Sequence, residues 1–343
     1  MPIVANLLEP WVLLSVIASA IATLLLVRAG STSLLVLRRF DARRATEGQL
    51  ALERRIELAS TFVRVSFALD LASLLLLALS ADKLSHAIRG AMCGYGVFAA
   101  NDWGFRALFA AIGSVFATGL LAQAYAFDAR VRGMDLARPL SVATLVTVPV
   151  GIAKCALVWL FLTKLDLTVV ASCCSVDLDT TAADATTYAH GPRELAAWGA
   201  PIAAALAVGI AVVASRRPTR GKVAVAGASA LFASVMGVAA AVLEVAPHAF
   251  ETPRHVCPFC LLKPDVLGVG YPLFGALLFA ALWAGGAGIA TLAARTPATA
   301  EAWEGFARVR LRREAAALVV AVLVGAAPVV RYAIVSGGAP LFR

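Results

Sequence analysis

Two cysteine motifs in this chain carry residue types that can do chemistry. Cys257-Pro258-Phe259-Cys260 holds two thiols separated by two residues. Such a pair can close a small disulfide ring or bind one soft metal ion with little chain strain. Cys257 is expected to begin a helix, with Pro258 at the first helical position, so that the helix N-terminus stabilises its thiolate. Cys260 would then be the resolving thiol. A redox pair, a metal or cofactor site and a purely structural disulfide are the three interpretations.

The second motif is the adjacent pair Cys173-Cys174. Adjacent cysteines can form a strained, readily reduced disulfide, chelate a soft metal, or each pair with a distant thiol. Cys93 lies in a glycine-rich turn and is expected to form half of a stabilising bridge. His255 can act as a base for Cys257 or simply be a solvated histidine. If the chain binds metal instead, the candidate ligands are Cys93, Cys173, Cys174, His190, His255, Cys257 and Cys260.

The elements that must position these residues are membrane spans. The 343 residues are 61% hydrophobic and only 15% charged, whereas soluble domains carry about 45–50% apolar and about 25% charged residues. Apolar stretches of about 20 residues, long enough to cross a hydrocarbon core, recur throughout. Backbone amides find no partner in lipid, so these continuous stretches must be helices. We predict an all-α, polytopic helix bundle, which excludes collagen-like, disordered and nucleic-acid-binding classes. The eight predicted spans are Pro10–Val27, Leu58–Ser80, Ala107–Phe127, Leu140–Thr163, Ala196–Ala214, Val223–Val245, Val266–Leu292 and Ala316–Val330.

The distribution of lysine and arginine predicts the orientation of these spans. One set of connections holds 19 basic residues and the opposite set holds nine. The richer side should face the cytoplasm, which places both termini outside. All four histidines and five of the six cysteines then lie on the outer face. We expect a bacterial cytoplasmic (inner) membrane with these loops in the periplasm, where disulfides are chemically allowed.

Four ionisable residues fall within the predicted spans. Arg64 and Glu244 lie near span ends, where long side chains can reach the interface. Asp70 and Lys154 are deeper, and buried charge is expensive in lipid. We expect these two to pair across two helices as a structural contact, with a proton path as the alternative. Cys155, next to Lys154, is expected to be a packing residue.

Three short motifs resemble the vitamin K epoxide reductase family and its bacterial disulfide-forming relatives. They are Cys174-Ser175-Val176, Trp198-Gly199-Ala200-Pro201 and Cys257-Pro258-Phe259-Cys260-Leu261. The resemblance implies a four-helix core over residues 140–292. A three-helix membrane region, 1–139, would precede it, and an inner loop with a last span, 293–343, would follow.

The resemblance also implies an activity, that of a membrane thiol–disulfide oxidoreductase. Cys257 and Cys260 would exchange electrons with a quinone, and Cys174, with Cys173 beside it, would relay them from a periplasmic thiol protein. Membrane lipid is the other expected partner. Two further interpretations stay open: a protein that binds or transports copper, zinc or mercury, and a membrane scaffold with structural disulfides inside a larger complex.

Overall fold

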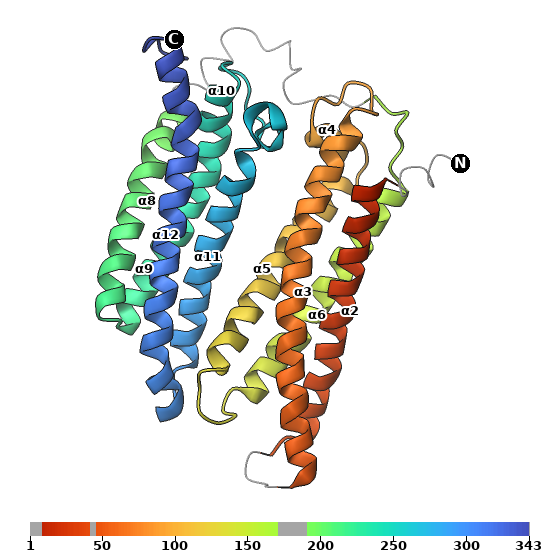
Figure 1. The fold of residues 1–343 in the computed structure, drawn as a ribbon, viewed down its shortest axis with the longest axis vertical. Helices are drawn as coiled ribbons and strands as arrows, with labels where there is room; N and C mark the ends of the chain where they lie inside the picture. The colour runs from red at the N-terminus through yellow and green to blue at the C-terminus, as the bar shows by residue number, and fades with distance from the viewer. Residues whose placement is uncertain (1–8, 42–45, 171–190, 343) are drawn as a thin grey trace. The chain divides into compact units, whose positions relative to one another are not determined.

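The computed structural model describes residues 9–41, 46–170 and 191–342. These residues form helices and connections, and no strand occurs among them. Eight of the helices are long and apolar enough to cross a membrane by length and composition, which identifies an integral membrane protein. Figure 1 shows their order along the chain.

Each of the eight predicted spans corresponds to one helix or continuous helical stretch. The long helices are α2 (Pro10–Arg39), α3 (Glu47–Ser85), α5 (Gly104–Asp128), α6 (Ala137–Thr163), α8 (Pro192–Arg216), α9 (Arg220–Ala240), α11 (Gly270–Ala293) and α12 (Pro297–Val335). The π-helical turn η1 (Ala241–Val245) and α10 (Ala246–Ala249) prolong α9. The short elements are α4 (Gly94–Ala99) and the 3₁₀ turns η2 (Cys260–Leu262) and η3 (Pro264–Val266).

Several helices extend beyond the apolar stretches that predicted them. α3 begins at Glu47 because the Thr46 side chain accepts a hydrogen bond from the backbone N–H of Gln49 and caps the helix. α12 begins at Pro297, well before the apolar run starts at Ala316. Hydropathy therefore locates the membrane-crossing part of a helix and not its polar ends.

The chain divides into two compact units. Unit 1 comprises Met1–Ala171 and Leu292–Trp303, and unit 2 comprises Ser172–Thr291 and Glu304–Arg343. This grouping differs from the three regions expected from the sequence, because α6 belongs to the first unit and most of α12 to the second. Each unit has the same order of elements: two long helices, a connection that carries cysteine, and two further long helices.

In unit 2 we name the two ends of the helices by their connections. The cysteine end holds residues 250–269, between α10 and α11. The arginine end holds the turn from Arg216 to Arg220, between α8 and α9. The first turns of α12 share this end, since Arg308 donates a hydrogen bond to the carbonyl oxygen of Ser215 at 3.2 Å.

Serine side chains hold α2 and α3 together in unit 1. Ser15 and Ser73 each donate to the other's carbonyl oxygen at 3.1 Å, and Ser66 donates to the carbonyl oxygen of Ala22 at 2.9 Å. Small residues let two helix backbones approach closely in a membrane protein, where association depends on packing and hydrogen bonds. These contacts fix the register of the first helix pair.

The predicted pair of Asp70 and Lys154 is confirmed at the centre of unit 1. Lys154 Nζ lies 2.7 Å from Asp70 Oδ1, and the two side chains are only 2% and 3% exposed. Lys154 also donates to Ser19 Oγ at 2.9 Å, while Ser114 and Thr118 donate to Asp70 Oδ2 at 2.9 and 3.1 Å. Because α2, α3, α5 and α6 each contribute, this polar cluster joins all four long helices.

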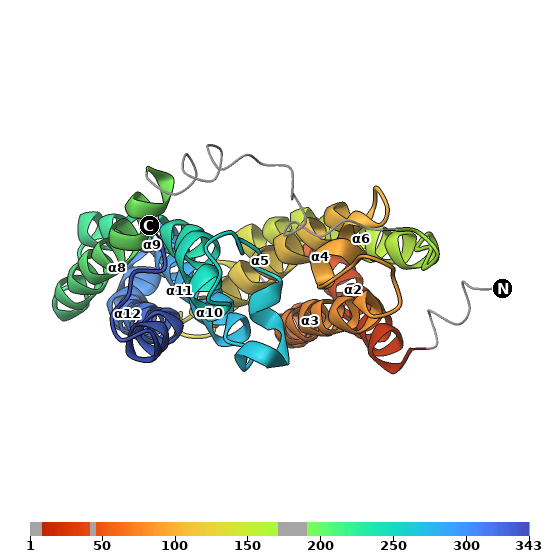
Figure 2. The same ribbon diagram turned by 90° about the horizontal axis from the view of Figure 1, so that it is seen from above.

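Unit 2 is built on alanine instead. Figure 2 shows α8, α9, α11 and α12 grouped as a bundle. Its central cluster is Ala203, Ala207, Ala230, Ala233, Ala280, Ala284, Ala317 and Leu318. Such small side chains bring helices close, and a Cβ added to Gly227 of α9 would lie in ordinary van der Waals contact, 3.7 Å from the carbonyl oxygen of Ala284 in α11. The bundle core is therefore apolar and built from small side chains near its middle.

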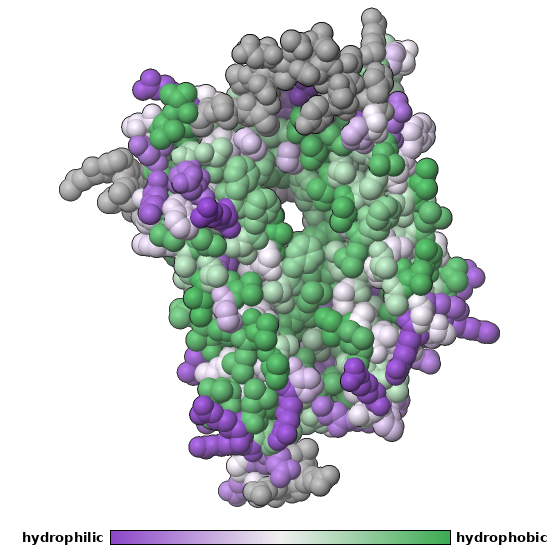
Figure 3. Space-filling model, turned by 180° about the vertical axis from the view of Figure 1, so that it is seen from behind, coloured by the Kyte–Doolittle hydropathy of each residue, from purple (hydrophilic) through white to green (hydrophobic). Residues whose placement is uncertain are grey.

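Large apolar side chains cover the outward faces of the helices. Leu206 on α8 and Phe232 and Val235 on α9 are each more than half exposed. In Figure 3 hydrophobic side chains occupy the middle stretches of the visible helices, and hydrophilic ones gather toward helix ends. This is the surface that lipid would cover.

Candidate thiol pair and apolar cavity in unit 2

Cys257 and Cys260 lie in the connection between α10 and α11. The backbone turns at Pro258 and Phe259 and enters the 3₁₀ turn η2, in which Leu262 N–H bonds to the Phe259 carbonyl at 3.1 Å. Both thiols are buried, with 1% and 3% of the residue exposed, and their sulfur atoms lie within 4.8 Å of each other. Modest side-chain rotation can bring two sulfurs at this separation to the disulfide bond length of about 2 Å.

The expectation that Cys257 begins a helix was wrong. The long helix α11 begins at Gly270, and η2 and η3 precede it. Lys263, the residue before Pro264, has an extended backbone as residues before proline prefer, which stops η2. Leu267 and Gly268 then adopt positive φ values of 57° and 59°, a conformation that ends η3. The thiolate of Cys257 is therefore not stabilised by the N-terminus of α11.

Leu261 connects the thiol pair to the interior of unit 2. It is fully buried in a second apolar cluster, which consists of Ala241, Val245, Ala246, Ala249, Leu261, Leu273, Leu277 and Ala321. Four of these residues, Val245, Leu273, Leu277 and Ala321, also line a cavity of about 390 Å³. The residue next to Cys260 thus belongs to an apolar cluster that supplies part of the wall of a cavity among α8, α9, α11 and α12, although Leu261 does not itself line the cavity.

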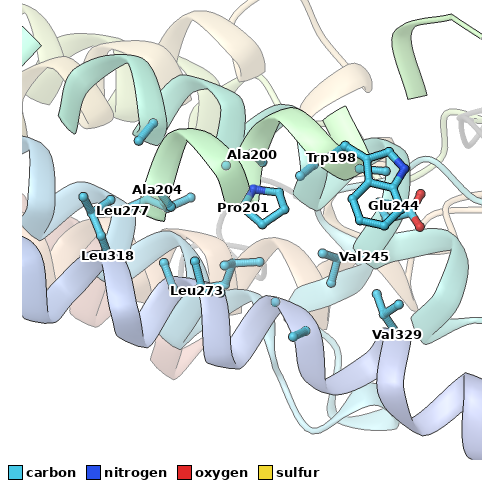
Figure 4. A pocket seen from close by; sticks show the side chains of 18 of the residues that line it. Trp198, Ala200, Pro201, Ala204, Glu244, Val245, Leu273, Leu277, Leu318 and Val329 are labelled. Carbon is cyan, nitrogen blue, oxygen red and sulfur yellow. The ribbon is translucent and has the colours of Figure 1, made fainter. Parts of the chain in front are cut away.

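The cavity is apolar along most of its length and polar at one end. Figure 4 shows Trp198 and Glu244 together at one end and Ala204, Leu277 and Leu318 toward the other. At the polar end Arg193 donates to both carboxylate oxygens of Glu244, at 2.9 and 3.4 Å. An elongated apolar molecule with one polar end matches this distribution.

The polar end is held by further contacts at the cysteine end of unit 2. His248 Nδ1 lies 2.7 Å from the carbonyl oxygen of Glu244 and 3.6 Å from its carboxylate. The guanidinium carbon of Arg193 lies 3.3 Å from the ring centroid of Phe342, whose ring also meets His248 edge-on. Glu244 therefore binds neighbouring protein groups, where the sequence led us to expect a side chain extended toward water.

Two helix irregularities shape the cavity wall. Pro247 has no N–H, and its ring would crowd the carbonyl of Leu243 four residues earlier, so the chain widens into the π-helical turn η1 that carries Glu244. Pro201 lies inside α8 and removes one hydrogen bond of that helix. Its ring lines the cavity. Proline and π turns are common causes of bends in long helices.

The other predicted residues are distributed as follows. Cys93 lies at the N-cap position of α4 in unit 1. The ring of His255 stacks on Phe250, with centroids 4.1 Å apart. Cys173, Cys174 and His190 lie outside the described residues. Their roles as relay thiols or ligands stay predictions.

The sequence analysis missed Arg193 and Trp198 as parts of a site. Trp198 was noted only for its motif, and Arg193 only as a basic residue of an outer connection. The available signal was the pair of opposite charges, Arg193 and Glu244, at the ends of two neighbouring predicted spans. The signal is weak, because many charges in such connections face water.

No protein-family model, curated protein or solved structure matches the chain. Of the three motifs that resemble the vitamin K epoxide reductase family, the structure describes two. Residues 198–201 lie in α8, where Trp198, Ala200 and Pro201 line the cavity, and residues 257–261 form the thiol turn.

Proposed function

We propose that the chain is a membrane thiol–disulfide oxidoreductase in which Cys257 and Cys260 pass electrons to a quinone held in the cavity of unit 2. The observation that carries this proposal is the position of the thiol pair. Its sulfur atoms lie within 4.8 Å of each other, and the adjacent Leu261 belongs to the apolar cluster of which Val245, Leu273, Leu277 and Ala321 line the cavity.

The proposed reaction is balanced by two electrons and two protons. The dithiol of Cys257 and Cys260 becomes a disulfide, and the quinone becomes a quinol. A partner dithiol then attacks the disulfide, forms a mixed disulfide and leaves oxidised, which restores the two thiols. The net reaction converts one partner dithiol and one quinone into one partner disulfide and one quinol.

The residues of the cavity fit such an acceptor. Its volume of about 390 Å³ lies within the usual range of about 300–1,000 Å³ for small-molecule sites. Trp198 offers a flat aromatic surface for a ring, and the apolar walls suit an isoprenoid-like tail. Arg193 can donate hydrogen bonds to a ring carbonyl at the polar end, while Glu244 holds its guanidinium in place.

We further propose that Cys173 and Cys174 relay electrons from a periplasmic thiol protein to the pair. Under the predicted topology, Cys93 follows the second span and Cys257 the sixth. An even number of crossings separates them, so they share a side of the membrane. The proposed membrane is a bacterial inner membrane with the cysteine-bearing connections in the periplasm.

The direct test is quinone-dependent oxidation of the purified, reduced protein. We expect decylubiquinone to be reduced with the loss of two alkylatable thiols per quinol formed. Cys257→Ser and Cys260→Ser should abolish this reaction. Cys155→Ser is the matched control, because Cys155 is a half-buried thiol in α6 of unit 1 and is not part of the proposed pair. Wild-type protein whose thiols resist excess quinone would contradict the proposal.

A second test addresses the cavity. Ala204 lines it, whereas Leu206 on the same helix is 61% exposed and faces away from the bundle. Ala204→Trp should fill the cavity and raise the KM for quinone at least tenfold. Leu206→Trp should leave the KM unchanged. Equal effects of the two tryptophans would show that the quinone reacts elsewhere.

The second candidate function is the binding or transport of a soft metal ion. The separation of the Cys257 and Cys260 sulfur atoms also allows both to bind one such ion. That function predicts copper, zinc or mercury that survives purification and is released when the thiols are alkylated. Metal analysis of the sample used for thiol titration decides between the two. A scaffold with structural disulfides would instead lose stability in Cys257→Ser and show no quinone reaction in the wild type.

A further inference from the structure

Glu314 is a carboxyl group buried inside a helix of membrane-spanning length. The residue is 0% exposed, and neither carboxyl oxygen has a hydrogen-bond partner in the part of the chain that the structure describes. Buried polar groups are normally hydrogen-bonded, and ionisable groups inside membranes are rare and expensive. A carboxyl group in this setting calls for a functional explanation.

The spacing of residues along α12 places Glu314 on the face that packs into unit 2. Buried residues follow one another at intervals of three or four, which is the repeat of a single helix face. This stripe consists of Ala307, Leu311, Glu314, Leu318 and Ala321. Leu318 belongs to the central alanine cluster formed with α8, α9 and α11. Glu314 therefore points into the same bundle core.

Within the described part of the chain, the buried faces of α8, α9 and α11 offer Glu314 no counter-charge. Among the buried residues that the structure describes on α8, α9 and α11, the only polar side chains are Ser215 and Ser234. On its own helix, Arg310 is one turn away and its guanidinium lies over the ring of Phe306, 4.5 Å from the centroid. An ionised carboxylate without a partner is strongly disfavoured in apolar surroundings. The neutral, proton-bearing form is the one that this core accommodates.

Glu314 also stands between the cavity and the arginine end. Leu318 lines the cavity, and Glu314 is one helical turn, about 6 Å, closer to the arginine end of α12. Beyond it lie the first turns of α12, where Arg308 binds the carbonyl oxygen of Ser215. A proton that enters from that end reaches Glu314 before it reaches the cavity.

We propose that Glu314 is a proton-binding site inside unit 2 that exchanges its proton with the arginine end. The proposal goes beyond the redox function and is independent of it.

The proton site is tested by carbodiimide labelling of the full-length protein in detergent, followed by mass spectrometry. Dicyclohexylcarbodiimide is apolar and reacts with protonated carboxyl groups in apolar surroundings. We expect it to label Glu314, and the labelling to fall as the pH rises. A water-soluble carbodiimide should label the exposed Glu304 of the same helix instead. Folded protein in which Glu314 stays unlabelled at every pH, while detergent-unfolded protein is labelled, would overturn the proposal.

Thermal unfolding provides a second measurement of the same site. Glu314→Gln keeps the shape of the side chain and removes its ability to ionise. In the unfolded chain Glu314 is exposed to water and releases its proton more readily than in the folded protein. The free energy of unfolding of wild type therefore falls as the pH rises. We expect Glu314→Gln to be more stable than wild type, with a gap that widens with pH. Glu304→Gln should show no such trend, and a gap that is constant with pH would refute proton binding.

Discussion

Replacing Asp70 by asparagine in unit 1 is expected to destabilise the protein more than replacing its partner Lys154 by methionine. In Asp70→Asn the ammonium group of Lys154 stays buried without a counter-charge. It keeps Ser19 Oγ at 2.9 Å and can still donate to the amide oxygen of the asparagine, but neither acceptor carries a negative charge. In Lys154→Met, Asp70 keeps the hydrogen bonds from Ser114 and Thr118 and can take up a proton. Asp70→Asn is therefore expected to lower the free energy of unfolding more than Lys154→Met does.

The magnitudes follow from burial and hydrogen bonding. Removing one partner of a buried ion pair costs about 3–5 kcal/mol, because an uncompensated charge remains. We expect Asp70→Asn to fall in that range. Lys154→Met should cost about 2 kcal/mol, since two hydroxyl donors still satisfy the carboxyl group. The double variant carries no buried charge, so it should be more stable than Asp70→Asn alone.

The assay is the free energy of unfolding in mixed micelles as the fraction of denaturing detergent rises. Cys155→Ser is the control, because it changes a half-buried polar group next to Lys154 without touching the ion pair. Its cost should stay within about 1 kcal/mol. If the double variant is less stable than Asp70→Asn, the charge of Lys154 is compensated by groups outside this cluster, and the reasoning fails.

Two further predictions concern unit 2. Glu244→Gln should lower the free energy of unfolding by about 1–3 kcal/mol, because it replaces two charge-assisted hydrogen bonds from Arg193; an unchanged midpoint of detergent unfolding would contradict this. Gly237→Ala should destabilise by about 1 kcal/mol or more, since its Cβ would lie 2.7 Å from Leu277 Cδ2. Gly209→Ala, whose Cβ meets nothing within 4 Å, should stabilise the protein by about 0.5–1 kcal/mol. If Gly237→Ala and Gly209→Ala change the stability in the same direction, the packing argument is refuted.

Sequence alone predicted the all-helical class, the eight spans and the pairing of Asp70 with Lys154. These predictions succeeded because they depend on strong local rules. A long apolar stretch in lipid must satisfy its own backbone, and two opposite charges deep in neighbouring spans have few other partners. The exact depth of each residue was not needed for either conclusion.

Features that depend on three-dimensional packing were beyond the sequence. The cavity forms from side chains of four helices, and its polar end depends on a π-helical turn that hydropathy does not reveal. The non-helical backbone at Cys257 follows from the turn at Pro264 and Leu267, which a short CxxC motif does not encode. Glu314 was assigned to an inner connection, because the arginines before it lower the hydropathy of that part of the helix. The spacing of Leu311, Glu314 and Leu318 by three and four residues, which puts them on one helix face, is the sequence signal that could have found it.

The polar cluster around Lys154 has a consequence for motion. It takes side chains from every long helix of unit 1, so sliding any helix by one residue, about 1.5 Å, breaks short ionic contacts. The central interfaces of unit 2 consist mainly of alanine methyl groups, which form no hydrogen bonds, and the hydrogen bonds of Arg193 with Glu244 and of Arg308 with Ser215 lie near the helix ends. If the protein alters its shape as it works, unit 1 should act as the stiff frame and unit 2 as the part that yields.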